Sequence, residues 1–224
     1  MDAYIEVRNV SKRYKDYTVL EDVSYSFERG GRYAITGENG SGKSVFLKLL
    51  TGYAKPTSGE VAVNGHILRK DIYFIQNAGI IINAPEFIPS LSGMDNLLYL
   101  AEIRNKIGRK EILQTLDKLE LTEARDKKVK TYSQGMKQRL RLAQALMEDP
   151  ETLILDEPLN AIDRRGLDAI RQLLNEYNRK GTTLIFTSHY SADIEKMADV
   201  ILEIADGRLQ PESGREPTAV LSWL

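Results

Sequence analysis

The segment at residues 37–44, which reads GENGSGKS, has the residue types needed to hold the phosphates of a nucleotide. It matches the pattern G-x-x-x-x-G-K-S, in which glycines let successive backbone N–H groups turn toward an anion. We expect Lys43 to reach the β- and γ-phosphates and the Ser44 hydroxyl to ligate magnesium. The loop residues predicted to bind the nucleotide are Gly37, Asn39, Gly40, Ser41, Gly42, Lys43 and Ser44.

Two carboxylates, Asp156 and Glu157, directly follow the apolar run at residues 152–155. If that run is a strand, its carboxyl end lies where α/β folds bind ligands, beside the phosphate loop. We expect Asp156 to hold magnesium through water. We expect Glu157 to orient or deprotonate an attacking water, which contributes about 10²–10⁴-fold in rate. A solvated acidic turn is the alternative for this pair in isolation, but together with the loop it predicts hydrolysis of the terminal phosphate.

Between these two elements, residues 132–139 read YSQGMKQR, which resembles the signature sequence of ATP-binding cassette (ABC) ATPases. Ser133 and Gly135 match the common form. Gln134 and Met136 depart from it, although drug- and antibiotic-exporter members commonly carry Met-Lys-Gln-Arg here. Ser133 can cap a helix whose N-terminus faces an anion. The resemblance implies that Ser133 and Gly135 face the γ-phosphate of an ATP held by a second subunit.

Other motifs of that family follow in the same chain order, so the resemblance spans about residues 3–209. Residues 160–163, NAID, resemble the D-loop that crosses the dimer interface. His189 resembles the switch histidine that contacts the γ-phosphate, and it joins Glu157 and Lys43 as the predicted catalytic residues. Tyr14 resembles the aromatic residue that stacks on adenine, a contact worth about 1–3 kcal/mol; an exposed loop tyrosine, with Tyr17 close by, is the alternative.

The main departure from the family lies at its Q-loop. A glutamine usually follows the strand that leads into the helical subdomain, but here Asn83 follows the run at residues 79–82. Gln76 precedes that run, so we do not assign it the role. Asn83 keeps the amide with one methylene fewer, and we expect it to meet magnesium through water or to serve mostly in coupling.

The pattern of apolar residues predicts the elements that must position these motifs. Runs without polar alternation indicate strands buried on both faces of a parallel sheet, at residues 79–82, 152–155 and 182–187. Earlier strands are predicted at residues 4–7 and 19–27, followed by a hairpin around Asn64 and Gly65. Helices are predicted at residues 44–50, 94–107, 110–119, 134–147 and 167–177.

These elements predict an α/β fold of the P-loop NTPase (RecA-like) type. A parallel-sheet core is joined by an N-terminal antiparallel β subdomain and an inserted helical signature subdomain. We expect one domain over residues 1–209, followed by a tail at 210–224 that carries Trp223. Within the domain, the predicted core covers about residues 1–83 and 147–209, and the helical subdomain covers about residues 84–146.

The composition excludes several classes of function. The 224 residues carry a net charge of −1, so no broad positive field is available to hold nucleic acid. The chain has no cysteine, which excludes disulfides and cysteine-ligated metals. No stretch approaches the roughly 20 apolar residues needed to span a bilayer, so a membrane-spanning part is predicted to be another chain.

The resemblance implies an ATP-hydrolysing transporter subunit that uses ATP and Mg²⁺. Two copies are expected to pair head-to-tail around two ATP molecules and to drive a separate integral membrane permease, in the direction of export. This places the chain in the cytoplasm, at the inner face of the membrane. The alternative within the family is a soluble ABC ATPase that acts on a macromolecular assembly. A kinase or GTPase with a phosphate loop is the third alternative; the missing Asn-Lys-x-Asp motif disfavours a GTPase, and the signature helix disfavours a kinase.

Overall fold

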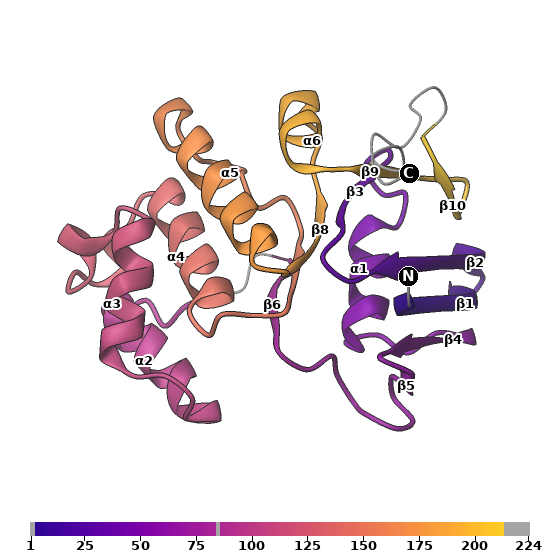
Figure 1. The fold of residues 1–224 in the computed structure, drawn as a ribbon, viewed down its shortest axis with the longest axis horizontal. Coiled ribbons are helices and arrows are strands. Elements are labelled where there is room, and N and C mark those ends of the chain that lie inside the picture. The colour runs from indigo at the N-terminus through magenta and orange to yellow at the C-terminus, as the bar shows by residue number, and fades with distance from the viewer. Residues whose placement is uncertain (1–2, 84–85, 213–224) are drawn as a thin grey trace, which may run out of the picture.

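Two sheets and a group of helices form the fold in a computed structural model that describes residues 3–83 and 86–212 (Figure 1). The larger sheet contains, in spatial order, β10 (Arg208–Pro211), β9 (Val200–Ala205), β3 (Arg32–Thr36), β8 (Thr183–Thr187), β7 (Thr152–Leu155) and β6 (Ala78–Ile81). All neighbours in it are parallel except β10 and β9. The smaller sheet is antiparallel and contains β2 (Tyr17–Glu28), β1 (Ala3–Tyr14), β4 (Ser58–Val63) and β5 (His66–Ile67).

The helices flank the larger sheet. They are α1 (Lys43–Thr51), α2 (Gly93–Arg104), α3 (Arg109–Lys118), α4 (Gln134–Leu146), α5 (Arg164–Arg179) and α6 (Ser191–Met197). Two short 3₁₀ turns, η1 (Thr122–Ala124) and η2 (Val129–Thr131), precede α4. Figure 1 shows α2, α3 and α4 gathered at one end of the molecule and the antiparallel sheet at the other. Within the described ranges, no helix is long and apolar enough to span a bilayer.

The larger sheet is buried on both faces, as its apolar runs predict. Successive residues of β7 face opposite ways because side chains alternate along a strand. Leu153 and Leu155 pack into one apolar cluster with α2 to α5, while Ile154 packs into a second cluster with α1 and the antiparallel sheet. All three are fully buried. The parallel core with an antiparallel β layer and a helical group is therefore confirmed.

The predicted hairpin is confirmed in detail. Asn64 and Gly65 have φ angles of 50° and 76°, the left-handed pair of a type I′ turn, and Val63 pairs with His66. The preceding strands were harder to predict. β1 and β2 are each twelve residues long, and register shifts along them break the alternation that would reveal their length.

The C-terminal elements differ most from the prediction. The sequence pattern did not reveal α6, β9 or β10, because each is short and α6 lacks a repeated apolar spacing. The strand β10 includes Gln210 and Pro211, so regular structure runs past the predicted start of the tail. Trp223 lies outside the described residues. The division of residues 1–209 into core and helical subdomains stays a prediction.

One glycine brings the backbones of β6 and α4 together. A Cβ atom on Gly79 would lie 2.0 Å from the carbonyl oxygen of Ala145, an impossible approach to a backbone atom. The absence of a side chain at Gly79 therefore lets the strand abut the helix directly.

We predict that Gly79→Ala lowers the free energy of unfolding by about 1–3 kcal/mol, because the added methyl must push a helix backbone away. Gly108→Ala is the control, since its Cβ would meet nothing closer than 3.8 Å and its φ of −123° suits any residue. Urea denaturation of both variants measures the difference. Equal losses in the two variants would contradict the close approach.

Candidate nucleotide-binding and hydrolysis site

The phosphate loop joins β3 to α1, and its glycines adopt backbone conformations that other residues rarely reach. Gly37 and Gly42 have φ angles of 131° and 107°, in the left-handed region. A Cβ on Gly37 would also lie 2.4 Å from the carbonyl oxygen of Ile204. No side chain caps the N-terminus of α1, so the first N–H groups of the helix remain available to an anion.

Lys43, the first residue of α1, directs its ammonium group back over this loop. Its Nζ donates hydrogen bonds to the carbonyl oxygens of Gly37 and Glu38, at 2.7 Å and 2.8 Å. Burial lowers the pKa of Lys43, while the Glu157 and Asp156 carboxylates act in the opposite direction. The loop therefore holds a buried cation between its own carbonyls and the two acids.

Asp156 connects three elements at the carboxyl edge of the larger sheet. Its Oδ2 accepts a hydrogen bond from the Ser44 hydroxyl at 2.6 Å, and its Oδ1 accepts one from the Thr187 hydroxyl at 2.8 Å. Thr187 also accepts a hydrogen bond from the backbone N–H of Glu157, at 2.8 Å. The motifs in the sequence do not point to Thr187. Its place at the end of an apolar strand, directly beside another such strand, was the only available signal.

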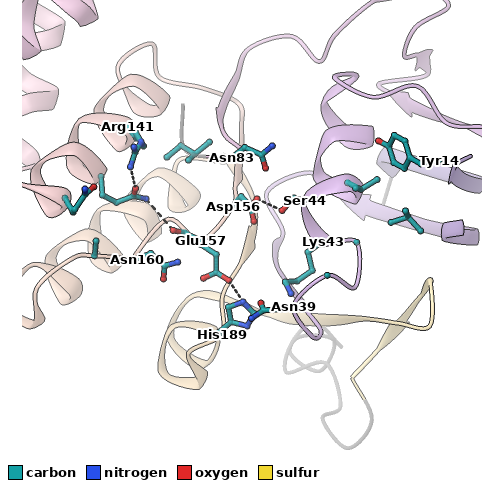
Figure 2. Close-up of a pocket in the computed structure, with 18 of the residues that line it drawn as sticks. Tyr14, Asn39, Lys43, Ser44, Asn83, Arg141, Asp156, Glu157, Asn160 and His189 are labelled. Carbon is teal, nitrogen blue, oxygen red and sulfur yellow. Dashed lines mark hydrogen bonds and ion pairs between the residues drawn. The ribbon is translucent and has the colours of Figure 1, made fainter. Parts of the chain in front are cut away.

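Glu157 faces the cavity with one carboxylate oxygen close to a histidine. The Nε2 atom of His189 lies 3.0 Å from Oε1 of Glu157 (Figure 2). That oxygen is buried and has no hydrogen bond among the described residues. Burial raises the pKa of the Glu157 carboxyl, His189 and Lys43 lower it, and Asp156 raises it. A carboxylate with a raised pKa that faces the cavity is suited to accept a proton from water.

Asn83 reaches this edge because its strand runs parallel to β7. Ile81 pairs with Leu155, and the N–H of Asp156 donates to the carbonyl of Ile81 at 2.7 Å. Asn83, two residues beyond β6, has a φ of 56° and lines the same cavity as Asp156. Gln76 lies before β6, where its Nε2 donates to the Phe74 carbonyl, and it does not line the cavity.

One face of α4 completes the cavity with side chains that are not among the predicted site residues. Gln134, Gln138 and Arg141 line it, and their spacing of four and three residues places them on one side of the helix. The amide of Gln138 donates to the carbonyls of Pro158, at 2.8 Å, and Glu157, at 3.4 Å, while its oxygen accepts from Arg141 at 3.0 Å. This polar i, i+4, i+7 pattern was the signal that could have identified them.

The other predicted residues divide into two groups. The cavity has a volume of 650 Å³, and the predicted residues that line it are Tyr14, Asn39, Gly40, Gly42, Lys43, Ser44, Asn83, Asp156, Glu157 and His189. The predicted residues outside its lining are Gly37, Ser41, Ser133 and Gly135. Ser133 is exposed and caps α4 by accepting a hydrogen bond from the N–H of Met136 at 3.2 Å.

Tyr14 stands at the far end of the cavity from Glu157 (Figure 2), and Tyr17 also lines the cavity. Tyr14 and Tyr17 pair across the turn between β1 and β2, and about half of Tyr14 is exposed. The Lys12 ammonium lies 4.7 Å from the centre of the Tyr14 ring, so one ring face already has a cationic contact. Stacking of Tyr14 on adenine stays a prediction.

The donor atoms fit a nucleotide with magnesium better than a metal bound by protein alone. Within residues 3–83 and 86–212, no cluster of three histidine, aspartate or glutamate side chains could hold an ion. Magnesium bound with a phosphate chain needs only one or two carboxylates, because phosphate oxygens and water supply the rest. The adjacent oxygens of Ser44 and Asp156 meet that requirement.

Comparison with known proteins agrees with this geometry. Residues 20–160 match the family model described as ABC transporter. The ABC transporter ATP-binding protein YybJ of Bacillus subtilis (strain 168) is 40% identical over 92% of this chain and 94% of its own. The bacitracin transport ATP-binding protein BcrA of Enterococcus faecalis is 36% identical over 95% of this chain and 70% of its own length. A dimeric ATP-binding cassette solved with ADP and Pi has a TM-score of 0.83 at 25% identity, covering 94% of this chain and 100% of that one.

We predict that Thr187→Val destabilises the fold, because the Glu157 N–H and one Asp156 oxygen lose a buried partner. The expected loss in free energy of unfolding is about 1–3 kcal/mol, measured by urea denaturation. Thr187→Ser keeps the hydroxyl and serves as the matched control. Valine and serine variants of equal stability would show that the hydroxyl contacts do not matter.

Proposed function

This chain belongs to the ATP-binding proteins of the ABC transporter family, and from that premise we propose how its residues hydrolyse ATP and drive a membrane permease. The chain is an ATPase. The observation that carries the proposal is the convergence of Lys43, Ser44, Asp156, Glu157 and His189 on one 650 Å³ cavity.

Nucleotide binding begins with an exchange of partners at Lys43. Its ammonium leaves the carbonyls of Gly37 and Glu38 for the β- and γ-phosphates, which are stronger acceptors. The loop N–H groups and the N-terminus of α1 bind the same phosphates. Tyr14 stacks on adenine, and Tyr17 stands beside it on the cavity wall.

Ser44 and Asp156 would hold magnesium, and Asn83 would contribute through water. Bound there, the ion neutralises charge on the phosphate oxygens. The hydrogen bond between Ser44 and Asp156 holds the hydroxyl oxygen and the carboxylate oxygen 2.6 Å apart. Thr187 fixes the other carboxylate oxygen of Asp156, so the side chain cannot rotate away.

Glu157 acts as the general base. It accepts a proton from a water whose oxygen attacks the terminal phosphorus, as the bond from that phosphorus to the ADP oxygen breaks. His189 lies beside it, with Nε2 3.0 Å from the carboxylate, and its role in this proposal is to contact the terminal phosphate. Phosphoryl transfer depends mainly on positioning and charge neutralisation, and these side chains provide both.

Dimerisation completes the site. Ser133 is exposed at the N-terminal end of α4 and lies outside the lining of the chain's own cavity, as does Gly135. In a head-to-tail homodimer they face the γ-phosphate bound to the second copy. ATP then favours the closed pair, and hydrolysis removes the contacts that hold it together. The dimeric cassette similar to this chain supports the arrangement.

A permease docks beside the helical group. A second cavity, of 270 Å³, is lined by Glu86, Phe87, Ile88, Asn96, Tyr99, Leu100 and Gln144. Nearby on α2, Ile103 is 75% exposed. In this proposal an apolar segment of a membrane partner occupies this surface, and the chain works at the inner face of the membrane. The proposed direction is export, which the Gly-Met-Lys-Gln-Arg signature supports, and the similar protein BcrA is named for the transport of bacitracin.

We predict that Glu157→Gln binds ATP but turns it over about 10²–10⁴-fold more slowly, because the amide cannot accept a proton. ATP-bound dimer should then accumulate, as measured by size-exclusion chromatography with and without ATP. Glu102→Gln, an exposed site on α2, is the control. Undiminished turnover in the Glu157 variant would refute its assignment as the base.

We also predict that Lys43→Ala weakens ATP binding about 10- to 100-fold, the effect of losing charge-assisted hydrogen bonds worth roughly 1.5–3 kcal/mol. Titration calorimetry with ATP measures it. Lys48→Ala, five residues further along α1, controls for loss of positive charge on the same helix. An unchanged affinity in the Lys43 variant would contradict the loop assignment.

A further inference from the structure

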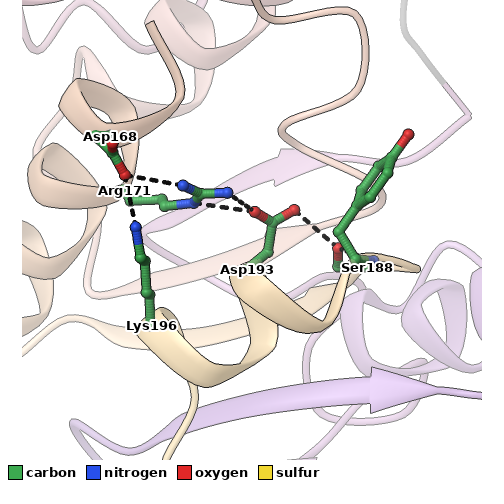
Figure 3. A network of polar contacts seen from close by, with 6 residues as sticks. Asp168, Arg171, Ser188, Asp193 and Lys196 are labelled. Atoms are coloured by element: carbon green, nitrogen blue, oxygen red, sulfur yellow. Dashed lines mark hydrogen bonds and ion pairs between the residues drawn. The ribbon is translucent and has the colours of Figure 1, made fainter. Parts of the chain in front are cut away.

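A buried ion pair lies directly behind the loop that carries His189 (Figure 3). Asp193, in the first turn of α6, is only 2% exposed. Arg171 of α5 directs both Nε and Nη2 at its Oδ1 atom, and the Nε contact measures 3.0 Å. A carboxylate this deeply buried is costly unless it is paired and hydrogen-bonded. Arg171 supplies the compensating charge.

The second oxygen of Asp193 holds the histidine loop through one hydroxyl. Its Oδ2 accepts a hydrogen bond from Ser188 at 3.0 Å, and the same Ser188 hydroxyl accepts one from the N–H of Tyr190 at 3.1 Å. A serine has one proton to donate, and here it goes to the carboxylate. Ser188 and Tyr190 flank His189, so the backbone on both sides of the histidine is tied to Asp193.

His189 depends on such support because little else restrains it. Its side chain is 45% exposed, and its ion-pair partner Glu157 is itself a reacting group. A displacement of about 1 Å in a catalytic group can cost about 10²-fold in rate. The backbone at residues 188–190 must therefore set the position of the imidazole ring.

The outer end of the network rests on exposed groups. Arg171 Nη1 and Lys196 Nζ both donate to Oδ1 of Asp168, each at 2.9 Å. The Asp168 side chain is 72% exposed, so water screens this end, and contacts of that kind contribute little. The buried half, from Arg171 through Asp193 to Ser188, is the part that reaches the site.

We infer that Ser188, Asp193 and Arg171 are positioning residues for His189. Arg171 holds the Asp193 carboxylate, that carboxylate holds the Ser188 hydroxyl, and Ser188 fixes the backbone on either side of His189. The inference rests on the proposed role of His189 in ATP hydrolysis. Arg171 belongs to α5, which begins three residues after Ala161 at the cavity wall, so the network joins the histidine loop to the helix that follows that wall.

The test is a double-mutant cycle on ATP turnover. Ser188→Ala removes the hydroxyl and leaves the Arg171–Asp193 pair intact, so the fold is retained. We expect its kcat to fall about 10- to 100-fold while the KM for ATP stays within about twofold. Ser188→Thr should recover turnover by restoring the hydroxyl. Asp168→Asn, which breaks only the exposed end, should keep the wild-type kcat.

The decisive comparison is made in a His189→Ala background. If Ser188 acts through His189, adding Ser188→Ala to that variant should cause no further loss. Equal losses in both backgrounds would overturn the inference and leave the proposed function standing. Full turnover in His189→Ala alone would instead refute the role of the histidine in the proposed function.

Discussion

The carboxylate of Asp156 is the point on which the site depends. It accepts one hydrogen bond from the Ser44 hydroxyl and another from the Thr187 hydroxyl, and so joins α1 to the ends of β7 and β8. The phosphate loop and the acidic pair are 112 residues apart in the chain, and this contact brings them together. The backbone of Glu157 is held by the same threonine, and His189 follows that threonine by two residues.

Local sequence was enough to identify the parts of the site that are contiguous. The loop at residues 37–44 carries its own glycines, lysine and serine, so its conformation and its ligand follow from neighbouring residues. The same holds for the Asn64-Gly65 turn and for the Ser133 cap of α4, both of which the structure confirms. Each depends on backbone rules that act over a few residues.

The contacts that were missed join residues distant in the chain. Thr187 meets Asp156 across 31 positions, Gln138 meets Pro158 across 20, and Arg171 meets Asp193 across 22. Single threonines, glutamines and arginines occur on many surfaces, and only the packing of α4, α5 and the sheet gives these their partners. The predicted ranges of β1 and β2 are too short for a related reason, because bulges interrupt the alternation of side chains that predicts a strand.

The close approach at Gly79 has a mechanical consequence. With no side chain between β6 and the backbone of α4, there is no soft layer to absorb a shift of the helix. Asn83 stands two residues past the end of β6, beside Asp156. A shift of the α4 backbone at Ala145 would therefore press directly on β6, the strand that ends two residues before Asn83.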